Sequence, residues 1–314
     1  MRSLAMAALG LIVLLGAALA VDPLPPDAPK DKEAAPPDKP APPAKPWAEN
    51  VEALRKSGLE VMIVVDSTGS MGGILLEFKT RLKPLLDTLA AVVPDVRLGA
   101  VLYRDKKQYD REDYDFTAKY MQLEPLDKEG VDRLLRFWRD AGAYGGGDIP
   151  EAVLDGVQTA AAKAGWTGVP TDMEWRDDAA FTPRRTEKKT PPDPKSSPRR
   201  VIVVIGDAPP HPEDNGVAKT VAACKAWKEA GGALSCIDTT GANKLMPEFG
   251  KMAEAGGGEA FALNDERKII QQTLIAVFGS AYKAEVEKAY NKAVGTKEVP
   301  KVPDGPMEFD RVEP

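Results

Sequence analysis

Residues 61–71 read Val-Met-Ile-Val-Val-Asp-Ser-Thr-Gly-Ser-Met, an apolar run followed by Asp66, Thr68 and Ser70 at every second position. A continuous Val/Ile run of this length is typical of a strand buried on both faces of a parallel sheet. Open α/β sheets bind their ligands at the carboxyl ends of such strands. We therefore expect the three alternating side chains to direct their oxygens to one point. Hard oxygen ligands without His or Cys favour Mg²⁺, Mn²⁺ or Ca²⁺. In the alternative interpretation, Asp and Ser here are N-caps of the helix that follows.

Two later segments add further oxygen-bearing loops. Residues 200–210 form a second apolar run that reaches Asp207, and residues 145–152 read Gly-Gly-Gly-Asp-Ile-Pro-Glu-Ala, a glycine loop that ends in Asp148 and Glu151. Together the three segments resemble the von Willebrand factor A domain and its metal-ion-dependent adhesion site. The resemblance covers residues 58–295. It implies a Rossmann-like, doubly wound sheet with strand order 3-2-1-4-5-6 and strand 3 antiparallel at the edge.

The resemblance also implies roles for individual residues. Thr68 and Ser70 match hydroxyls that bind the cation directly, and Asp66 and Asp207 match carboxylates that hold it through water. Residues 148–151, Asp-Ile-Pro-Glu, match the D-x-P-E form of integrin beta subunits, which places Glu151 as a ligand. In the alternative, Asp148 and Glu151 form a capping box that opens a helix over residues 149–164, with Pro150 in its first turn. Both interpretations can hold together.

A second cation site is implied less completely. Asp105, in the segment Tyr-Arg-Asp-Lys, matches an integrin acid that helps to hold a neighbouring Ca²⁺, together with Asp148, Glu151 and the Pro150 carbonyl. Gly146 stands where integrins have an Asn ligand. In the alternative, Asp105 is an ordinary surface acid that pairs with Arg104 or Lys106.

The composition divides the chain into segments. A basic start, a short apolar core and Ala-Leu-Ala at residues 18–20 are typical of a secretory signal peptide, with an uncleaved anchor as the alternative. We therefore expect a secreted or periplasmic protein without a membrane span in the mature chain. The net charge of −6, with interspersed Lys and Arg, argues against nucleic-acid binding. The expected segments are the signal peptide (1–20), a Pro/Ala/Lys-rich linker (21–46), the domain (47–295, insertion 165–199) and a polar tail (296–314).

Apolar strands alternate with amphipathic helices along the domain. This pattern predicts an α/β fold with a mostly parallel, six-stranded sheet and helices on both faces. The expected strands are 61–65, 97–103, 116–123, 201–205, 233–239 and 259–263, and the expected helices are 74–92, 128–140, 149–164, 218–230, 244–254 and 266–292.

Topology then assigns the loops to faces. The loop 106–115 should lie at the rim of the cation site, and the insertion 165–199 should lie on the opposite face. There Trp166 and Trp175 either seal the domain or form a second contact surface. The polar part of the last helix, from residue 282, either projects to meet a partner or is a solvated end. Cys224 and Cys236 fall where a helix and a strand meet, and a disulfide and two buried thiols are both compatible with their positions.

Three classes of function remain. The resemblance favours a metal-dependent binding module, not an enzyme, whose cation accepts an acidic side chain of a protein ligand. A metal-independent scaffold of the same fold is the first alternative. A hydrolase is the second, and it would depend on the single histidine, His211, which is more simply a polar loop residue near the site. The oligomeric state is not predicted.

Overall fold

The computed structural model describes residues 45–106, 115–146, 149–169, 174–175, 183–184, 197–242, 244–295 and 311–312. The predicted signal peptide, nearly all of the linker, residues 107–114 of the rim loop and Asp148 lie outside the described residues. Within the described part of the chain, no helix combines the length and the apolar composition that crossing a membrane requires.

A central sheet has the order β8-β7-β6-β1-β2-β3-β9. Its strands are β1 (Leu59–Asp66), β2 (Val96–Tyr103), β3 (Ala118–Pro125), β6 (Arg199–Gly206), β7 (Gly232–Asp238), β8 (Gly257–Ala262) and β9 (Arg311–Val312). β3 pairs antiparallel with β2. The pairs β2–β1, β1–β6, β6–β7 and β7–β8 are parallel. The six longer strands therefore confirm the predicted order. The two-residue strand β9 was not predicted and pairs antiparallel with β3.

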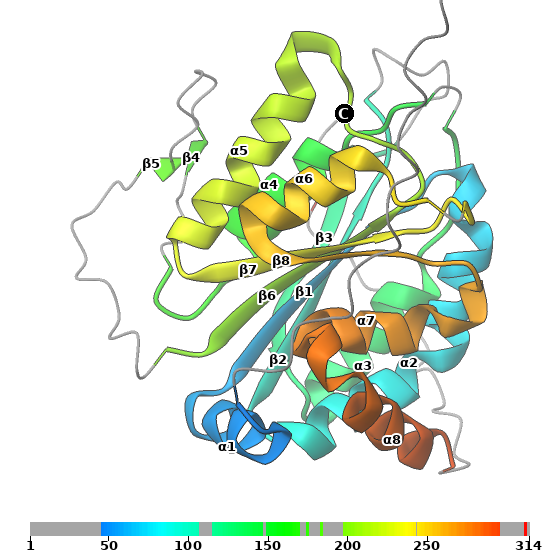
Figure 1. Ribbon diagram of the computed structural model, residues 1–314. Coiled ribbons are helices and arrows are strands. Elements are labelled where there is room, and N and C mark those ends of the chain that lie inside the picture. Colours follow the sequence, from blue (N-terminus) through cyan, green and yellow to red (C-terminus); the bar gives the residue numbers. More distant parts are fainter. Residues whose placement is uncertain are drawn as a thin grey trace, which may run out of the picture. The chain divides into compact units, whose positions relative to one another are not determined.

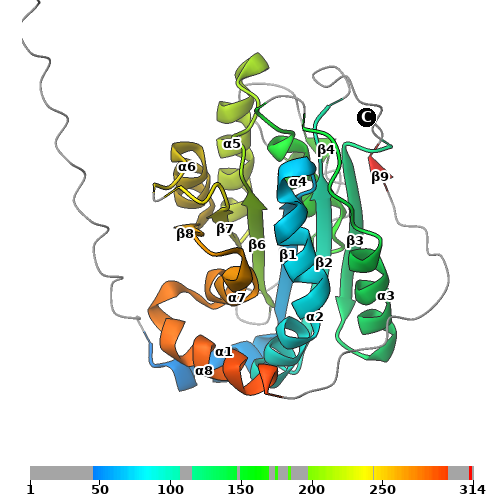
Figure 2. The ribbon, with the colours of Figure 1, turned by 90° about the vertical axis from the view of Figure 1, so that its right-hand side faces the viewer.

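Helices cover both faces of this sheet, with α2, α3 and α7 on one face and α4, α5 and α6 on the other (Figures 1 and 2). The helices are α1 (Trp47–Ser57), α2 (Gly72–Val92), α3 (Lys128–Arg139), α4 (Val153–Lys163), α5 (Gly216–Glu229), α6 (Pro247–Gly256), α7 (Ile269–Phe278) and α8 (Lys283–Val294). Short 3-10 turns are η1 (Gly69–Met71), η2 (Glu213–Asn215), η3 (Glu266–Lys268) and η4 (Ser280–Tyr282). In the insertion, β4 (Glu174–Trp175) and β5 (Pro183–Arg184) form a separate two-stranded sheet.

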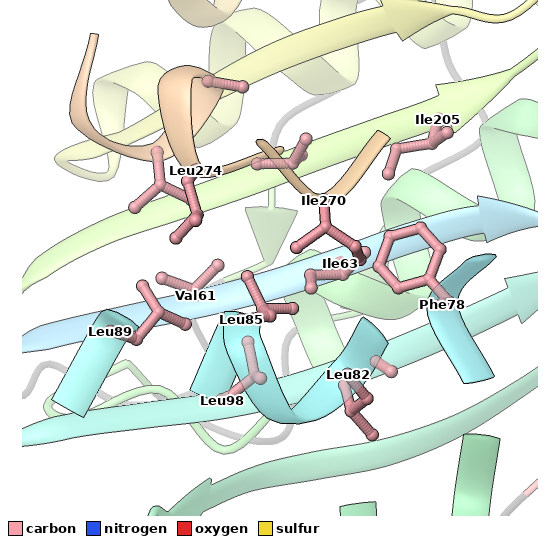
Figure 3. Packing of buried hydrophobic residues seen from close by; sticks show 14 of the residues in the cluster. Val61, Ile63, Phe78, Leu82, Leu85, Leu89, Leu98, Ile205, Ile270 and Leu274 are labelled. Carbon is pink, nitrogen blue, oxygen red and sulfur yellow. The ribbon is translucent and has the colours of Figure 1, made fainter. Parts of the chain in front are cut away.

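Strand β1 is buried along its whole length, as the apolar run predicts. Val61 and Ile63 point toward α2 and α7, where they meet residues such as Leu85 and Ile270 (Figure 3). Met62 and Val64 belong to the core on the opposite face. Because both faces are packed, the polar end of the strand is fixed in position by two cores.

The helix after the glycine loop starts later than predicted. Helix α4 begins at Val153 with Ala152 as its N-cap, and no side chain caps it. The predicted capping box from Asp148 to Glu151 is therefore wrong in this respect, because Glu151 lies outside the helix. Backbone hydrogen bonds to other loops hold this segment extended: the Glu151 amide donates to Pro209 O at 3.1 Å and the Ala152 amide donates to Arg104 O at 3.2 Å.

The last predicted helix is two helices, α7 and α8, separated at Gly279. Gly279 has φ +105°, a conformation that favours glycine, and it ends α7. Helix α8 then turns back and packs against α2, with Val286 and Tyr290 buried. The expectation of a polar extension that projects from the domain is therefore wrong.

Trp166 packs into the core at the end of the domain opposite the carboxyl ends of the parallel strands, as one alternative predicts, whereas the side chain of Trp175 lies outside the described part of the structure. Trp166 is buried, its ring lies 4.7 Å from that of Trp227, and its Nε1 donates to Ala160 O at 2.9 Å.

Cys224 and Cys236 are free, buried thiols, which corresponds to the second of the two alternatives. Burial raises the pKa of Cys224 to about 12 and that of Cys236 well above its ordinary value.

Candidate functional site

Asp66 is the last residue of β1 and its side chain is completely buried. Its Oδ1 accepts hydrogen bonds from the Thr68 amide at 2.8 Å and the Thr68 hydroxyl at 2.7 Å. Its Oδ2 is buried without a hydrogen-bond partner among the described residues. Burial raises the pKa of Asp66 to about 7; the hydrogen bonds from Thr68 oppose this rise, and the charges of Asp207 and Asp105 add to it. The end of β1 thus holds an incompletely compensated carboxylate.

Asp238 at the end of β7 provides an internal comparison. It is equally buried, and it ends a parallel strand of the same sheet. Its Oδ1 accepts from the Thr240 amide at 2.9 Å and its Oδ2 accepts from the Met246 amide at 2.7 Å. Asp238 therefore has a complete structural role as a turn-forming carboxylate, whereas Asp66 has an oxygen left over.

The hydroxyls after β1 are divided between the interior and the surface. Ser67 donates its hydroxyl to Tyr103 O at 2.9 Å and so belongs to the structure of the strand ends. Thr68 is buried beside Asp66, and Ser70, in η1 at the start of α2, is exposed. The predicted pair, Thr68 and Ser70, thus lies at the boundary between the buried carboxylate and solvent.

The glycine loop packs directly on this segment. The Gly69 amide donates to Gly145 O at 2.8 Å, and the Tyr144 amide donates to Ser67 O at 3.0 Å. Gly146 has φ +87°, and a Cβ on it would lie 3.0 Å from the Thr68 Cβ and 3.2 Å from the Glu151 Oε1. A side chain at position 146 would therefore intrude between Thr68 and Glu151, which explains why this loop has glycine there.

Glu151 approaches from the glycine loop before α4, and Asp207 approaches from the end of β6. Glu151 is buried and forms an isolated parallel bridge with Pro210, which belongs to the turn that follows Asp207. Asp207 is half-buried directly after β6. The backbone bonds described above hold Glu151 outside the helix, so its side chain lies against Gly146 beside Thr68. The structure thus places Asp66, Thr68, Glu151 and Asp207 near one another, and their role as cation ligands stays a prediction.

Asp105 is buried, whereas the alternative interpretation places it at the surface; the second cation site stays a prediction, because Asp148 lies outside the described residues. The Asp105 side chain is completely buried, and its Oδ1 accepts from the Lys106 amide at 2.6 Å and lies 2.5 Å from His211 Nε2. The Arg104 side chain pairs with Asp115 at 2.7 Å, and the Lys106 side chain pairs with Asp155 at 3.1 Å. The alternative of a surface acid paired with either of these side chains is therefore wrong.

Sequence reasoning missed two contributions to this region. The Arg104 guanidinium lies over the rings of Phe116, at 4.1 Å, and Tyr144, at 5.4 Å, and so contacts both the segment before β3 and the residue before the glycine loop. The second contribution is Tyr103, whose buried hydroxyl lies close to the carboxylates. An aromatic residue at the end of a buried strand, directly before Arg104 and Asp105, was the available signal.

Among the residues described, no group of three or more His, Cys, Asp or Glu side chains is arranged to hold a metal ion. Asp66, Glu151 and Asp207, which are all described, therefore do not form such a group by themselves.

No protein-family model and no curated protein matches this sequence. Among solved structures, the pilus adhesin SpaC from Lactobacillus rhamnosus GG matches with a TM-score of 0.44 and 9% identity, over 75% of this chain and 30% of that chain. The SpRpn10 VWA domain matches with a TM-score of 0.43 and 13% identity, over 68% of this chain and 94% of that one.

An aerotolerance-related membrane protein from Bacteroides fragilis NCTC 9343, with multiple mutations to serines, matches with a TM-score of 0.38 and 15% identity, over 75% of this chain and 100% of that one. The chain spans about 30% of the length of the pilus adhesin. All of these values are low, so the fold assignment rests on the strand order and pairing. With its main strands in the order 3-2-1-4-5-6 and an antiparallel third strand, this chain has the von Willebrand factor A fold.

Proposed function

We propose that this chain is an extracytoplasmic binding module that holds one Mg²⁺ or Mn²⁺ at the end of β1 and presents it to an acidic side chain of a protein partner. Thr68, Ser70 and Glu151 would bind the cation directly, and Asp66 and Asp207 would hold it through water. The observation that carries the proposal is the Asp66 carboxylate, which is fully buried, has an unpartnered Oδ2 and has its pKa raised to about 7. An adjacent cation would stabilise such a buried anion.

The remaining geometry supports the same cation. The set contains only hard oxygen donors, which suit Mg²⁺ and Mn²⁺. Gly146 leaves space between Thr68 and Glu151, and the exposure of Ser70 leaves one side open to solvent. When bound, the cation would supply a positive charge with an open coordination position for an external carboxylate. Glu151 adds a negative charge, which should strengthen retention of the cation and weaken its attraction for an acidic ligand.

We confine the proposal to one cation. A second site for Ca²⁺ would require Asp105, with Asp148, Glu151 and the Pro150 carbonyl. Asp105 Oδ1 already interacts with His211 Nε2 and the Lys106 amide, so only its buried Oδ2, which has no hydrogen-bond partner among the described residues, is left for a cation. A Ca²⁺ titration tests this point, since two sites per chain would contradict it.

A hydrolase would need a free histidine or serine side chain, and the contacts of His211 and Ser67 favour a binding function over catalysis. His211 Nε2 contacts Asp105, and Ser67 donates its hydroxyl to a backbone carbonyl. These contacts engage both groups in holding the strand ends together. The extracytoplasmic location rests on the predicted signal peptide at residues 1–20, and cell fractionation in the native host would test it.

Calorimetric titration with Mg²⁺, Mn²⁺ and Ca²⁺ tests the cation site. We expect one Mg²⁺ or Mn²⁺ per wild-type chain and no binding to Asp66→Ala or Asp207→Ala. Asp238→Asn is the matched control. It alters a buried carboxylate at the end of another parallel strand, and both oxygens of this carboxylate accept hydrogen bonds. It should lower stability and keep cation binding. A wild-type chain that binds none of the cations would contradict the proposal and support a metal-independent scaffold.

The partner class is tested separately with immobilised peptides that carry Asp or Glu, and with matched peptides that carry Asn or Gln. Binding should require both the acid and the cation. Equal capture of the acidic and amide peptides in EDTA would exclude cation-mediated recognition.

A further inference from the structure

Tyr103 is the last residue of β2 and the register partner of Asp66 on β1. Its side chain is completely buried. Its hydroxyl is buried without a hydrogen-bond partner among the described residues, as is Asp66 Oδ2. Two unpartnered polar groups on neighbouring strand ends are unusual, because buried polar groups in proteins are generally paired.

The Tyr103 ring reaches across the sheet. A Cβ on Gly156 of α4 would lie 2.8 Å from Tyr103 Cδ1, and a Cβ on Gly206 of β6 would lie 2.5 Å from the Tyr103 hydroxyl oxygen. Since β1 lies between β2 and β6, the ring crosses β1 near its end. The Cβ position on Gly206 also lies 3.4 Å from the Asp66 Cβ. Two glycines thus make room for a tyrosine whose hydroxyl ends next to Asp66.

The Tyr103 hydroxyl carries a proton, because a phenol ordinarily ionises only at about pH 10. The charged groups near it are Asp66, Glu151 and Asp207. A protonated phenol can donate one hydrogen bond, and the groups around it are carboxylates, which accept. The hydroxyl is therefore a hydrogen-bond donor directed toward the proposed cation site.

We propose that Tyr103 is a positioning residue of this site and that its hydroxyl donates to the Asp66 carboxylate when a cation is bound. Groups that hold metal ions in proteins are usually oriented by hydrogen bonds from outer partners, and Tyr103 supplies one from the buried side. The inference rests on the proposed function, because it requires the cation.

Tyr103→Phe tests this role, since it removes the hydroxyl and keeps the ring. We expect Mn²⁺ affinity, measured by calorimetry, to fall about 10- to 100-fold. The Tm in EDTA should stay unchanged or rise, because the substitution removes an unsatisfied buried polar group. A purely structural role predicts the reverse, namely a lower Tm in EDTA with unchanged affinity.

Tyr282→Phe is the control for loss of a tyrosine hydroxyl. The Tyr282 hydroxyl donates to Lys45 O at 2.9 Å, far along the chain from the site residues. This variant should lose stability and keep Mn²⁺ affinity. If the wild type binds no cation, the proposed function fails. If the wild type binds and Tyr103→Phe binds equally well, only the present inference is overturned.

A second variant is used if circular dichroism shows that Tyr103→Phe does not fold. Replacement of Tyr103 by 3-fluorotyrosine makes the phenol more acidic and so a stronger donor. Tighter Mn²⁺ binding would support the positioning role, and unchanged binding would overturn it.

Discussion

Asp66→Asn should stabilise the cation-free protein, and the gain should grow with pH. The folded chain holds the pKa of Asp66 at about 7, against an ordinary value of 3.8. A difference of this size corresponds to about 4 kcal/mol of unfolding free energy. Because the pKa is higher in the folded state, this contribution is fully present below pH 3.8 and is lost as the pH rises to about 7. Asparagine has no charge and avoids the loss.

Urea denaturation in EDTA at pH 5, 6, 7 and 8 measures this effect. From pH 5 to pH 8, the stability of Asp66→Asn relative to wild type should increase by about 3 kcal/mol, the part of the total that falls in this range. Saturating Mg²⁺ at pH 8 should stabilise the wild type and should leave the stability of Asp66→Asn unchanged. Asp238→Asn, which loses a satisfied carboxylate, should be less stable than wild type. A difference between Asp66→Asn and wild type that stays constant from pH 5 to pH 8 would refute the reasoning.

Three further substitutions or treatments test other parts of the structure. Gly146→Ala forces φ +87° on a residue with a Cβ, which would lie 3.0 Å from the Thr68 Cβ. It should lower the free energy of unfolding by about 1–2 kcal/mol and weaken Mn²⁺ binding. Unchanged calorimetric affinity would argue against a close approach of the loop to Thr68. Val286→Ala should cost about 2 kcal/mol in urea denaturation, because α8 packs on α2, and a change below 0.5 kcal/mol, on the order of a surface substitution, would indicate a solvated helix. Cys224 and Cys236 should resist alkylation in the folded protein and both react in urea without reductant; intact mass would reveal a disulfide if neither reacts.

The sequence predicted what depends on local pattern. The apolar run before Asp66 fixed the position of β1, and the alternation of Asp66, Thr68 and Ser70 placed the candidate site at its end. Contacts between distant segments were not predictable in this way. Glu151 and Asp148 satisfy a helix-capping pattern, but the Glu151 amide donates to Pro209 O and the Ala152 amide donates to Arg104 O, and these bonds keep Glu151 out of the helix.

The break in the last helix could have been predicted from the sequence, whereas the contact of Asp105 with His211 could not. Gly279 was a visible breaker of the last helix, and Val286 and Tyr290, four residues apart, mark an apolar face on the part that was predicted to be solvated. The contact between Asp105 and His211 joins residues 106 positions apart. Periodicity carries no information about such a pair, which depends on the sheet bringing the ends of β2 and β6 to the same side.

Strand β9 has a practical consequence for binding experiments. It pairs with the start of β3 at Ala118, whose other neighbour is Tyr103 at the end of β2, and Arg311 pairs with Asp115 at 3.3 Å. An affinity tag or surface linker joined to the C-terminal end of this chain would therefore begin within a few residues of the face that carries the proposed cation. Immobilisation by that end would turn this face toward the support and obstruct a partner. Attachment before α1 avoids the obstruction, because α1 leads into the opposite end of β1.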